Sequence, residues 1–403
     1  MLKRISQIEK GSKTVLLILY SYTFIRGIGR AAFIFLYPLY IISLGYSIND
    51  LGGIATLAAI LTILILPVTG YLIDHGWSKE MLLLSGITMS LALLLPASFP
   101  NYFVLVISYT LNNLGLYLWA PSRNKIIGSI IPTVLLGRIY SLFIILFNLS
   151  RTITPFILGR LTSDLGYEFL LSNVGLLTLL GTLIAYLSLL KTEKLYIRTP
   201  LSQIRIIESY KAMFSFDKSI LPIILFSMTD SFAWRLWFPL LNAYLKEFKG
   251  LTDPIIGDFN TLMGLSMLFT SYIAGSITDI IKPIKALVIY EVLGAIGILS
   301  IITPYPLFYI SGLLIGFSIA FWVSAYNTLI TVIFGVDKIG RLRVLTDSSR
   351  NIAAIPAPKI GGYIMSINPV LVFLLSAIIM GLSILPLTRI NVLCKNRCGD
   401  KDE

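Results

Sequence analysis

Long apolar runs recur along the whole of this 403-residue chain, and they constrain its fold more than any other feature. Each run is long enough for a helix of about 20 residues, which crosses about 30 Å of hydrocarbon. Lipid cannot satisfy exposed backbone groups, so spanning segments must be helices or closed barrels. A barrel would show alternating segments of about ten residues, and the sequence shows none. We therefore predict an all-α membrane protein.

The composition agrees with this prediction. Hydrophobic residues make up 56% of the chain and charged residues only 13%, whereas soluble domains carry about 25% charged residues. So little polar surface cannot coat a water-soluble globule of this size. The apolar runs predict twelve transmembrane helices, near residues 15–44, 50–73, 81–98, 102–122, 136–161, 168–190, 218–246, 254–279, 285–303, 306–334, 343–366 and 368–390.

The net charge of +12 is distributed unevenly along the chain. Most Lys and Arg residues lie in the terminal segments and in every second loop, which by the positive-inside rule places both termini in the cytoplasm of a cell-membrane protein. The basic excess therefore reflects topology rather than nucleic-acid binding. The first apolar run contains Arg26 and Arg30 and is too long for a cleaved signal, so we expect it to be retained. Cys394 and Cys398 alone do not indicate a metal site.

A polar interruption at residues 191–217 divides the chain into an N-terminal half, 1–190, and a C-terminal half, 218–403. Within it, residues 201–214 fit either an amphipathic helix at the membrane surface or an ordinary linker. The halves also match one another. A shift of 205 residues places Arg30 on Arg235, Gly45 on Gly250 and Asp74 on Asp279, and a shift of 203 places Pro155 on Pro358. We predict two pseudo-symmetric six-helix bundles joined by a cytoplasmic linker.

Two loops carry a recognisable motif. The sequence GYLIDHGWSK occupies residues 70–79, and GSITDIIKPIK occupies residues 275–285. Both resemble the Gly-x-x-x-Asp motif, with a following basic turn, of the major facilitator superfamily (MFS). The first copy matches at Gly70, Asp74 and Lys79, but His75 and Ser78 replace arginines of the pattern, and Gly76-Trp77 is inverted. The resemblance extends through the repeat over nearly the whole chain.

The resemblance implies a secondary transporter that works by alternating access. It also implies a conformational latch that holds the two halves together on the cytoplasmic side. Asp74 and Asp279 would then face the basic residues at the starts of the eleventh and fifth spans, Arg341 and Arg138. The alternative is that these charges are simply solvated. The predicted latch residues are Gly70, Asp74, Lys79, Arg138, Gly275, Asp279 and Arg341.

Charged residues inside the predicted spans are the main candidates for a binding site, since each costs about 2.5–3.5 kcal/mol to insert. Bases outnumber acids among them, which predicts an anionic substrate held by guanidinium groups. Arg30 and Arg235 would form a clamp, and Asp230 would pair with Arg235 or Arg26. The alternative is internal pairing or bonds to backbone carbonyls, and we expect Arg350 and Glu291 to be structural. The predicted substrate-binding residues are Arg26, Arg30, Arg151, Asp230, Arg235 and Lys359.

Energy coupling and the competing functions complete the prediction. Asp230 and Glu291 are the acids deep in spans, so either is a candidate for proton coupling, with H+ or another ion as partner; a structural ion pair is the alternative. The chain lacks a phosphate-binding loop and the common hydrolase motifs, so we expect neither a cofactor nor an enzyme. We predict a monomeric carrier of a small solute. The alternatives are proton-coupled multidrug efflux, a non-transporting receptor or an embedded enzyme.

Overall fold

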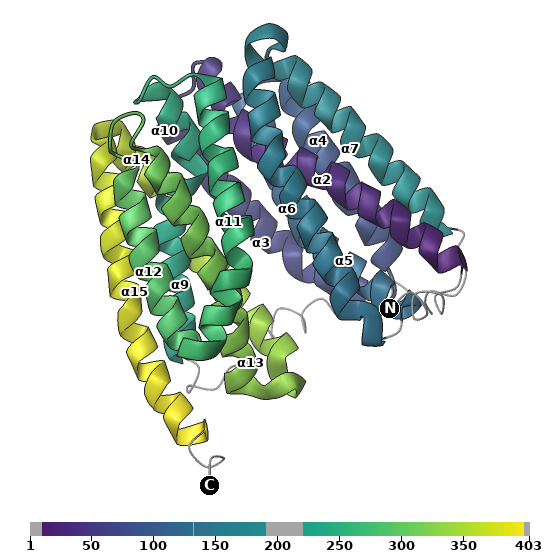
Figure 1. The fold of residues 1–403 in the computed structure, drawn as a ribbon. Helices are drawn as coiled ribbons and strands as arrows, with labels where there is room; N and C mark the ends of the chain where they lie inside the picture. Colours follow the sequence, from purple (N-terminus) through teal and green to yellow (C-terminus); the bar gives the residue numbers. More distant parts are fainter. Residues whose placement is uncertain (1–9, 132, 191–220, 399–403) are drawn as a thin grey trace. The chain divides into compact units, whose positions relative to one another are not determined.

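The computed structural model describes residues 10–131, 133–190 and 221–398, and these residues form helices joined by short turns (Figure 1). The first half contains α2 (Lys10–Ser43), α3 (Ile48–Asp74), α4 (Ser78–Ser98), α5 (Tyr102–Ile130), α6 (Thr133–Leu165) and α7 (Tyr167–Leu190). The second half contains α9 (Leu221–Trp237), η3 (Phe238–Leu240), α10 (Leu241–Glu247), α11 (Asp253–Ile281), α12 (Pro283–Ser300), α13 (Tyr309–Ala353), α14 (Ala357–Ile367) and α15 (Pro369–Cys398).

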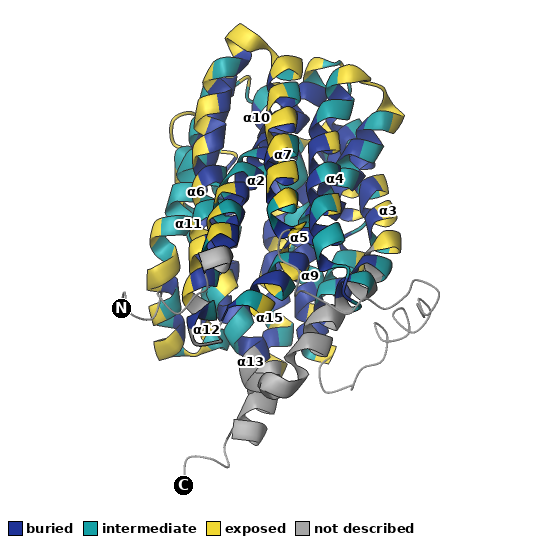
Figure 2. Cartoon of the chain, turned by 90° about the vertical axis from the view of Figure 1, so that its right-hand side faces the viewer, coloured by how far each residue is buried: buried dark blue, intermediate teal, exposed yellow. Residues whose placement is uncertain are grey.

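The exposed surfaces of the helices are apolar, and small or polar residues are buried. Figure 2 shows α7 with one exposed and one buried face. Its exposed face carries large apolar side chains, such as Leu180 and Ile184, and its buried face carries Thr178, Gly181 and Thr182. A helix with this pattern is suited to lipid, where small residues let backbones approach and hydroxyls bond within the bundle.

Ten helices in the described residues are long and apolar enough to cross a membrane. The other two predicted spans, 218–246 and 343–366, correspond to segments in which the helix is interrupted. The first interruption is η3, which contains Pro239 and separates α9 from α10. The second lies at residues 354–356, between α13 and α14, and includes Pro356. Proline explains both, because it removes a backbone donor and clashes with the preceding turn. The prediction of twelve helical spans is confirmed in outline, with two of them broken.

The predicted boundary between the tenth and eleventh spans was wrong. We expected these spans to end at residue 334 and begin at residue 343, but α13 continues through this region as a single helix of 45 residues. A straight helix of that length measures roughly 68 Å, about twice what the hydrocarbon requires. The segment 335–342 contains two glycines but no proline, so nothing in it forces a helix to end.

Contacts between residues divide the chain into two compact units. Unit 1 comprises residues 1–40 and 57–210, and unit 2 comprises residues 41–56 and 211–403. The start of α3 therefore groups with the C-terminal half of the chain. The predicted linker at 191–217 and its amphipathic segment at 201–214 lie outside the described residues.

Two of the matched glycines occupy equivalent turns. Gly45 lies between α2 and α3 with a φ of 87°, and Gly250 lies between α10 and α11 with a φ of 62°. Only glycine adopts such left-handed conformations without a steric cost. The sequence repeat therefore corresponds to a repeated turn that follows the first span of each half.

In unit 1, α4 packs against both α5 and α7, and α2 contributes to the same core. Tyr22 of α2 lies edge-on to Trp119 of α5, with ring centroids 5.1 Å apart. It also accepts a hydrogen bond of 3.1 Å from the Thr182 hydroxyl of α7. In unit 2, α13 packs against α11 and α12, and α9 packs against α15. These helices bury Arg26 in unit 1, and they bury Asp230 and Glu291 in unit 2.

The approach of α14 to α9 depends on Gly361. A Cβ atom at this position would overlap the backbone oxygen of Leu236, near the end of α9. Gly381 of α15 offers a contrast, because a Cβ atom there would meet nothing within 4 Å. The two helices can therefore touch only while position 361 lacks a side chain.

We expect Gly361→Ala to destabilise the protein by about 1–3 kcal/mol, the usual cost of overpacking, because backbone atoms would have to move. Thermal unfolding of the purified protein measures this effect. Gly381→Ala is the matched control and should be neutral or slightly stabilising, since alanine favours helix. Equal melting temperatures for the two variants would contradict the assigned packing of α14 on α9.

Candidate functional site

Arg26 lies in the core of unit 1, where its side chain is 1% exposed. Its guanidinium donates to the backbone oxygens of Ser85, at 3.2 Å, and of Gly115. The Tyr22 hydroxyl lies 3.4 Å away, and the ring of Trp119 lies 5.0 Å from the guanidinium carbon. These contacts hold α2, α4 and α5 together. Of the two roles considered for Arg26, the geometry fits bonds to backbone carbonyls better than contact with a substrate.

Arg30 lies one helical turn further along α2 and is half-buried. Its Nη1 atom is buried and has no hydrogen-bond partner among the described residues. Arg151 of α6 and two tyrosines, Tyr109 and Tyr117 of α5, lie close enough to interact with it electrostatically. Arg151 itself lies with its guanidinium carbon 5.7 Å from the ring of Phe147. Two guanidinium groups therefore share one region, and one of them has a free donor.

Within the described part of unit 1, no carboxylate compensates these arginines from mid-span. The acids that the structure describes in this unit, Glu80, Asp164 and Glu168, lie in the first or last turn of a helix. Like charges at close range raise each other's free energy unless a counter-charge is present. The region around Arg30 and Arg151 therefore has the electrostatic character of an anion-binding site. We call it the basic site.

Unit 2 contains a second cluster, with both signs of charge. Asp230 of α9 is fully buried, and one carboxyl oxygen lies 3.3 Å from a guanidinium nitrogen of Arg350 in α13. The other oxygen accepts a hydrogen bond from the Tyr290 hydroxyl of α12. Arg350 lies over the ring of Trp322, 4.2 Å from its centroid. Asp230 therefore pairs with Arg350 rather than with Arg235, and the alternative pairing with Arg26, which belongs to unit 1, stays a prediction.

Glu291 is the neighbour of Tyr290 on α12 and belongs to the same cluster. It is fully buried, and neither carboxyl oxygen has a hydrogen-bond partner in the part of the chain that the structure describes. Ser383 faces it, but this hydroxyl donates at 2.6 Å to the backbone oxygen of Met380. We call Asp230, Tyr290, Glu291 and Arg350 the acidic cluster.

The remaining predicted substrate residues lie elsewhere in unit 2. Arg235 donates to the Asn351 side-chain oxygen at 2.5 Å. Lys359 was expected near the middle of a span, but it is an exposed residue in the first turn of α14. Its Nζ atom lies 3.4 Å from the Asn49 backbone oxygen. The helix interruption before α14 accounts for this position. The clamp of Arg30 and Arg235 draws on both units and stays a prediction.

The latch also stays a prediction, because it would join the two units. The side chains of Asp74 and Arg341, like position Gly70, lie outside the described residues. Lys79 donates at 2.9 Å to the Leu189 backbone oxygen, which stabilises the C-terminal end of α7. Of the other predicted latch residues, Arg138 of α6 and Asp279 of α11 are exposed. A Cβ atom at Gly275 of α11 would lie 3.8 Å from the Ser324 hydroxyl. Lys125, which the sequence did not single out, bonds Ile73 in the same way as Lys79 bonds Leu189, at 2.6 Å.

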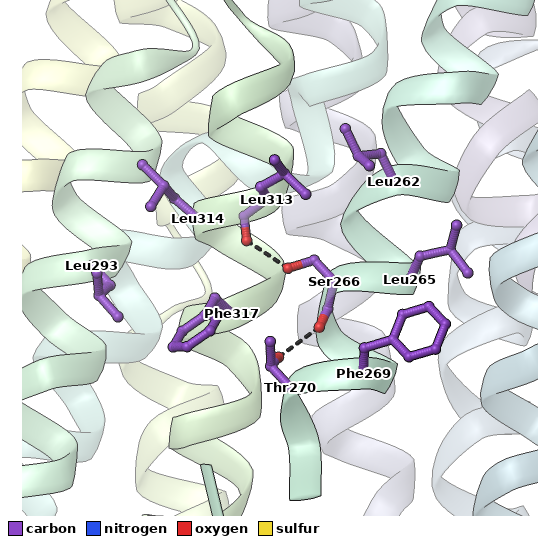
Figure 3. Close-up of a pocket in the computed structure, with 9 residues that line it drawn as sticks. All are labelled: Leu262, Leu265, Ser266, Phe269, Thr270, Leu293, Leu313, Leu314 and Phe317. Carbon is purple, nitrogen blue, oxygen red and sulfur yellow. Dashed lines mark hydrogen bonds between the residues drawn. The ribbon is translucent and has the colours of Figure 1, made fainter. Parts of the chain in front are cut away.

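An apolar groove of about 580 Å³ lies between α11, α12 and α13 (Figure 3). Its two hydroxyls are already engaged: Ser266 donates to the Leu313 backbone oxygen at 2.7 Å, and Thr270 donates to that of Ser266. The groove offers no charged side chain, so it does not resemble the basic site. Its lining residues are Leu262, Leu265, Ser266, Phe269, Thr270, Leu293, Leu313, Leu314 and Phe317.

A multi-pass helical protein whose spans carry charged clusters has the architecture of a membrane transporter. Comparison with known families agrees: the profile of the Major Facilitator Superfamily matches residues 19–229 and 223–393. The chain belongs to this family, as its motifs and repeat predicted. No curated protein matches the chain in sequence.

Solved structures share the fold. A bacterial homolog of the human lysosomal transporter Spinster, in an inward-facing and unoccupied conformation, superposes with a TM-score of 0.67 and 12% identity, over 96% of each chain. The same title describes an inward-facing and occupied conformation, with a TM-score of 0.69, 11% identity, and coverage of 94% of this chain and 97% of that chain. At these identities the likeness establishes the fold alone.

We expect Arg350→Met to destabilise the protein by about 3–5 kcal/mol, because it leaves Asp230 as an uncompensated buried charge. Adding Asp230→Asn should restore much of that loss, since the double variant buries no unpaired carboxylate. Thermal unfolding of the three variants and the wild type forms a double-mutant cycle.

Arg389→Met provides the control for this cycle, because Arg389 is an exposed arginine on α15. It should change stability by no more than about 0.5 kcal/mol. A double variant that is no more stable than Arg350→Met alone would show that the ion pair contributes nothing.

Proposed function

We propose that this membrane transporter is a secondary active carrier of a small organic anion and that the basic site binds the anion. The observation that carries the proposal is the pair Arg30 and Arg151, which lies in a unit whose described acids are all at helix ends. An anion supplies both a counter-charge for the two guanidinium groups and an acceptor for Nη1 of Arg30. Carboxylates and phosphates fit best, because guanidinium donates two parallel hydrogen bonds to them.

Three further residues, Arg26, Tyr109 and Tyr117, support the basic site. Arg26 is held by backbone carbonyls and positions α2, so Arg30, four residues later, projects from a fixed helix face. Tyr109 and Tyr117 supply hydroxyls near Arg30 that can add neutral hydrogen bonds. A solute that combines an anionic group with polar groups matches this set. The proposal involves movement of the solute and no chemistry on it.

Proton-coupled multidrug efflux is the second candidate. It is favoured by the acidic cluster, in which buried carboxyls lie beside aromatic rings such as Trp322 and Trp234. Aromatic and acidic groups together attract lipophilic cations. The ion pair between Asp230 and Arg350 argues against drug efflux, because Arg350 already occupies the position that a drug cation would take.

The test of the basic site is thermal stabilisation of the purified protein by small carboxylates, phosphate esters, sugars and lipophilic cations. We expect at least one anion to raise the melting temperature. Arg30→Ala and Arg151→Ala should each weaken its apparent affinity roughly ten- to a hundredfold, since each lost charge-assisted bond costs about 1.5–3 kcal/mol.

Arg160→Ala is the matched control, because Arg160 is an exposed arginine on the same helix as Arg151. It should leave the anion's effect unchanged. Stabilisation by lipophilic cations alone would replace the anion proposal with drug efflux. An anion effect that survives both Arg30→Ala and Arg151→Ala would place the binding site elsewhere.

The same proposal places the carrier in the cell membrane with both termini in the cytoplasm, as the basic segments predict. The chain itself provides a reporter, because its two cysteines, Cys394 and Cys398, both follow the last span. In intact cells, a membrane-impermeant maleimide should not label the wild-type protein, and permeabilisation should expose both thiols. Labelling of intact cells would reverse the proposed orientation, and a Cys394→Ser, Cys398→Ser double variant controls for background.

A further inference from the structure

The two carboxyls of the acidic cluster have unequal surroundings, although both are fully buried. Asp230 has a guanidinium at 3.3 Å and a tyrosine hydroxyl as partners. Glu291 has no hydrogen-bond donor among the described residues. A buried carboxylate without a donor or a cation costs several kcal/mol, and the neutral acid avoids most of that cost.

Besides Arg350, the described residues of the elements packed around Glu291 bring no base to it. Tyr326 and Asp347 of α13 interact with Arg350, so this guanidinium is shared by Asp230 and a further acid. The described charged residues of α11 lie in its first two turns and its last turn, at Asp253, Asp258 and Asp279. The described charged residue of α15, Arg389, is exposed. Several groups interact with Glu291 or with Arg350 beside it. They are Asp230 of α9, Tyr290 of α12, Tyr326 and Asp347 of α13, and Ser383 of α15.

From this geometry we propose that Glu291 is a proton-binding site and that H+ is the coupling ion of the carrier. The proposal deepens the proposed function, because the coupling role rests on the protein being a carrier. The proton-binding role depends only on the acidic cluster. With a proton on Glu291, the pair Asp230 and Arg350 is balanced and Glu291 is neutral. The sequence alone offered both Asp230 and Glu291 as candidates, and the different surroundings of the two acids favour Glu291.

When the proton leaves Glu291, Arg350 is the group in the cluster that can share the resulting negative charge. The O–H bond of Glu291 breaks, the proton passes to water, and a carboxylate remains. The Arg350 side chain is 23% exposed while that of Asp230 is 1% exposed, so Arg350 lies between the acids and the accessible space. A small shift of this guanidinium from Asp230 towards the new carboxylate shares its positive charge between the two acids, and the cluster carries one more negative charge until a proton returns from water to Glu291.

Infrared spectroscopy of the purified protein in lipid vesicles at neutral pH tests the proton directly. We expect a carbonyl-stretching band from a protonated carboxyl, and we expect Glu291→Gln to remove it. Glu247→Gln is the matched control, since Glu247 is exposed at the end of α10, and it should leave the band in place. Absence of the band in the wild type, or its persistence in Glu291→Gln, would overturn the proposal.

A coupling proton must also exchange with water. In D2O the Glu291 band should shift within minutes, and raising the pH should abolish it while the protein stays folded. A band that neither shifts in D2O nor titrates below the pH of unfolding would mark a permanently protonated structural glutamic acid and would overturn the coupling role.

Thermal unfolding supplies an independent measurement of the same group. Ionisation of Glu291 removes stability, so the wild-type melting temperature should fall as the pH rises, and Glu291→Gln should flatten this dependence. Equal slopes for the wild type and Glu291→Gln would contradict the assignment. Neither measurement requires a transported solute, so a failed anion screen leaves the proton site standing, and a failed proton site leaves the anion screen valid.

Discussion

The cost of placing a charged group where water cannot reach it determines how this protein is organised. In lipid, every guanidinium or carboxylate inside a span needs a partner within the protein. Arg26 finds backbone carbonyls of two neighbouring helices, and Arg350 finds Asp230 and an aromatic ring. Arg30 retains a buried nitrogen that has no hydrogen-bond partner among the residues described. Glu291 retains two such oxygens, so Arg30 and Glu291 are two charged positions inside spans where function is expected.

Much of the fold could be predicted from the sequence, because lipid imposes a simple rule of length and polarity on each span. The apolar runs predicted the helices of the first half closely, and the repeat of Gly45 and Gly250 marked equivalent turns. The errors occurred where helix ends depend on packing rather than on hydropathy. The helix is interrupted at Pro356, inside a predicted span. The segment 335–342, which was expected to separate two spans, is helical and belongs to α13.

The candidate sites were predictable only as a set of residues. The sequence shows which charges enter the membrane, but it does not show the rotation of each helix, which sets the partners. Asp230 and Arg350 are 120 positions apart, and a nearer base, Arg235, was the obvious partner on the same helix. That base instead bonds Asn351, the residue next to Arg350. Equivalent positions of the repeat, Arg30 and Arg235, therefore have different surroundings, because their neighbours on other helices are not repeated.

The two clusters divide the charge of the carrier in a way that links the two proposals. The basic site of unit 1 has positive charge in excess, and an anion reduces that excess. The acidic cluster of unit 2 gains negative charge when Glu291 loses its proton. A conformational change that carries these groups through low dielectric is least costly when both sites are compensated. An anion in the basic site and a proton on Glu291 together lower the excess charge of both units, whereas either alone lowers it in only one. Binding of the two is therefore expected to be coupled through the common cost of burying charge, even without direct contact between the anion and the proton.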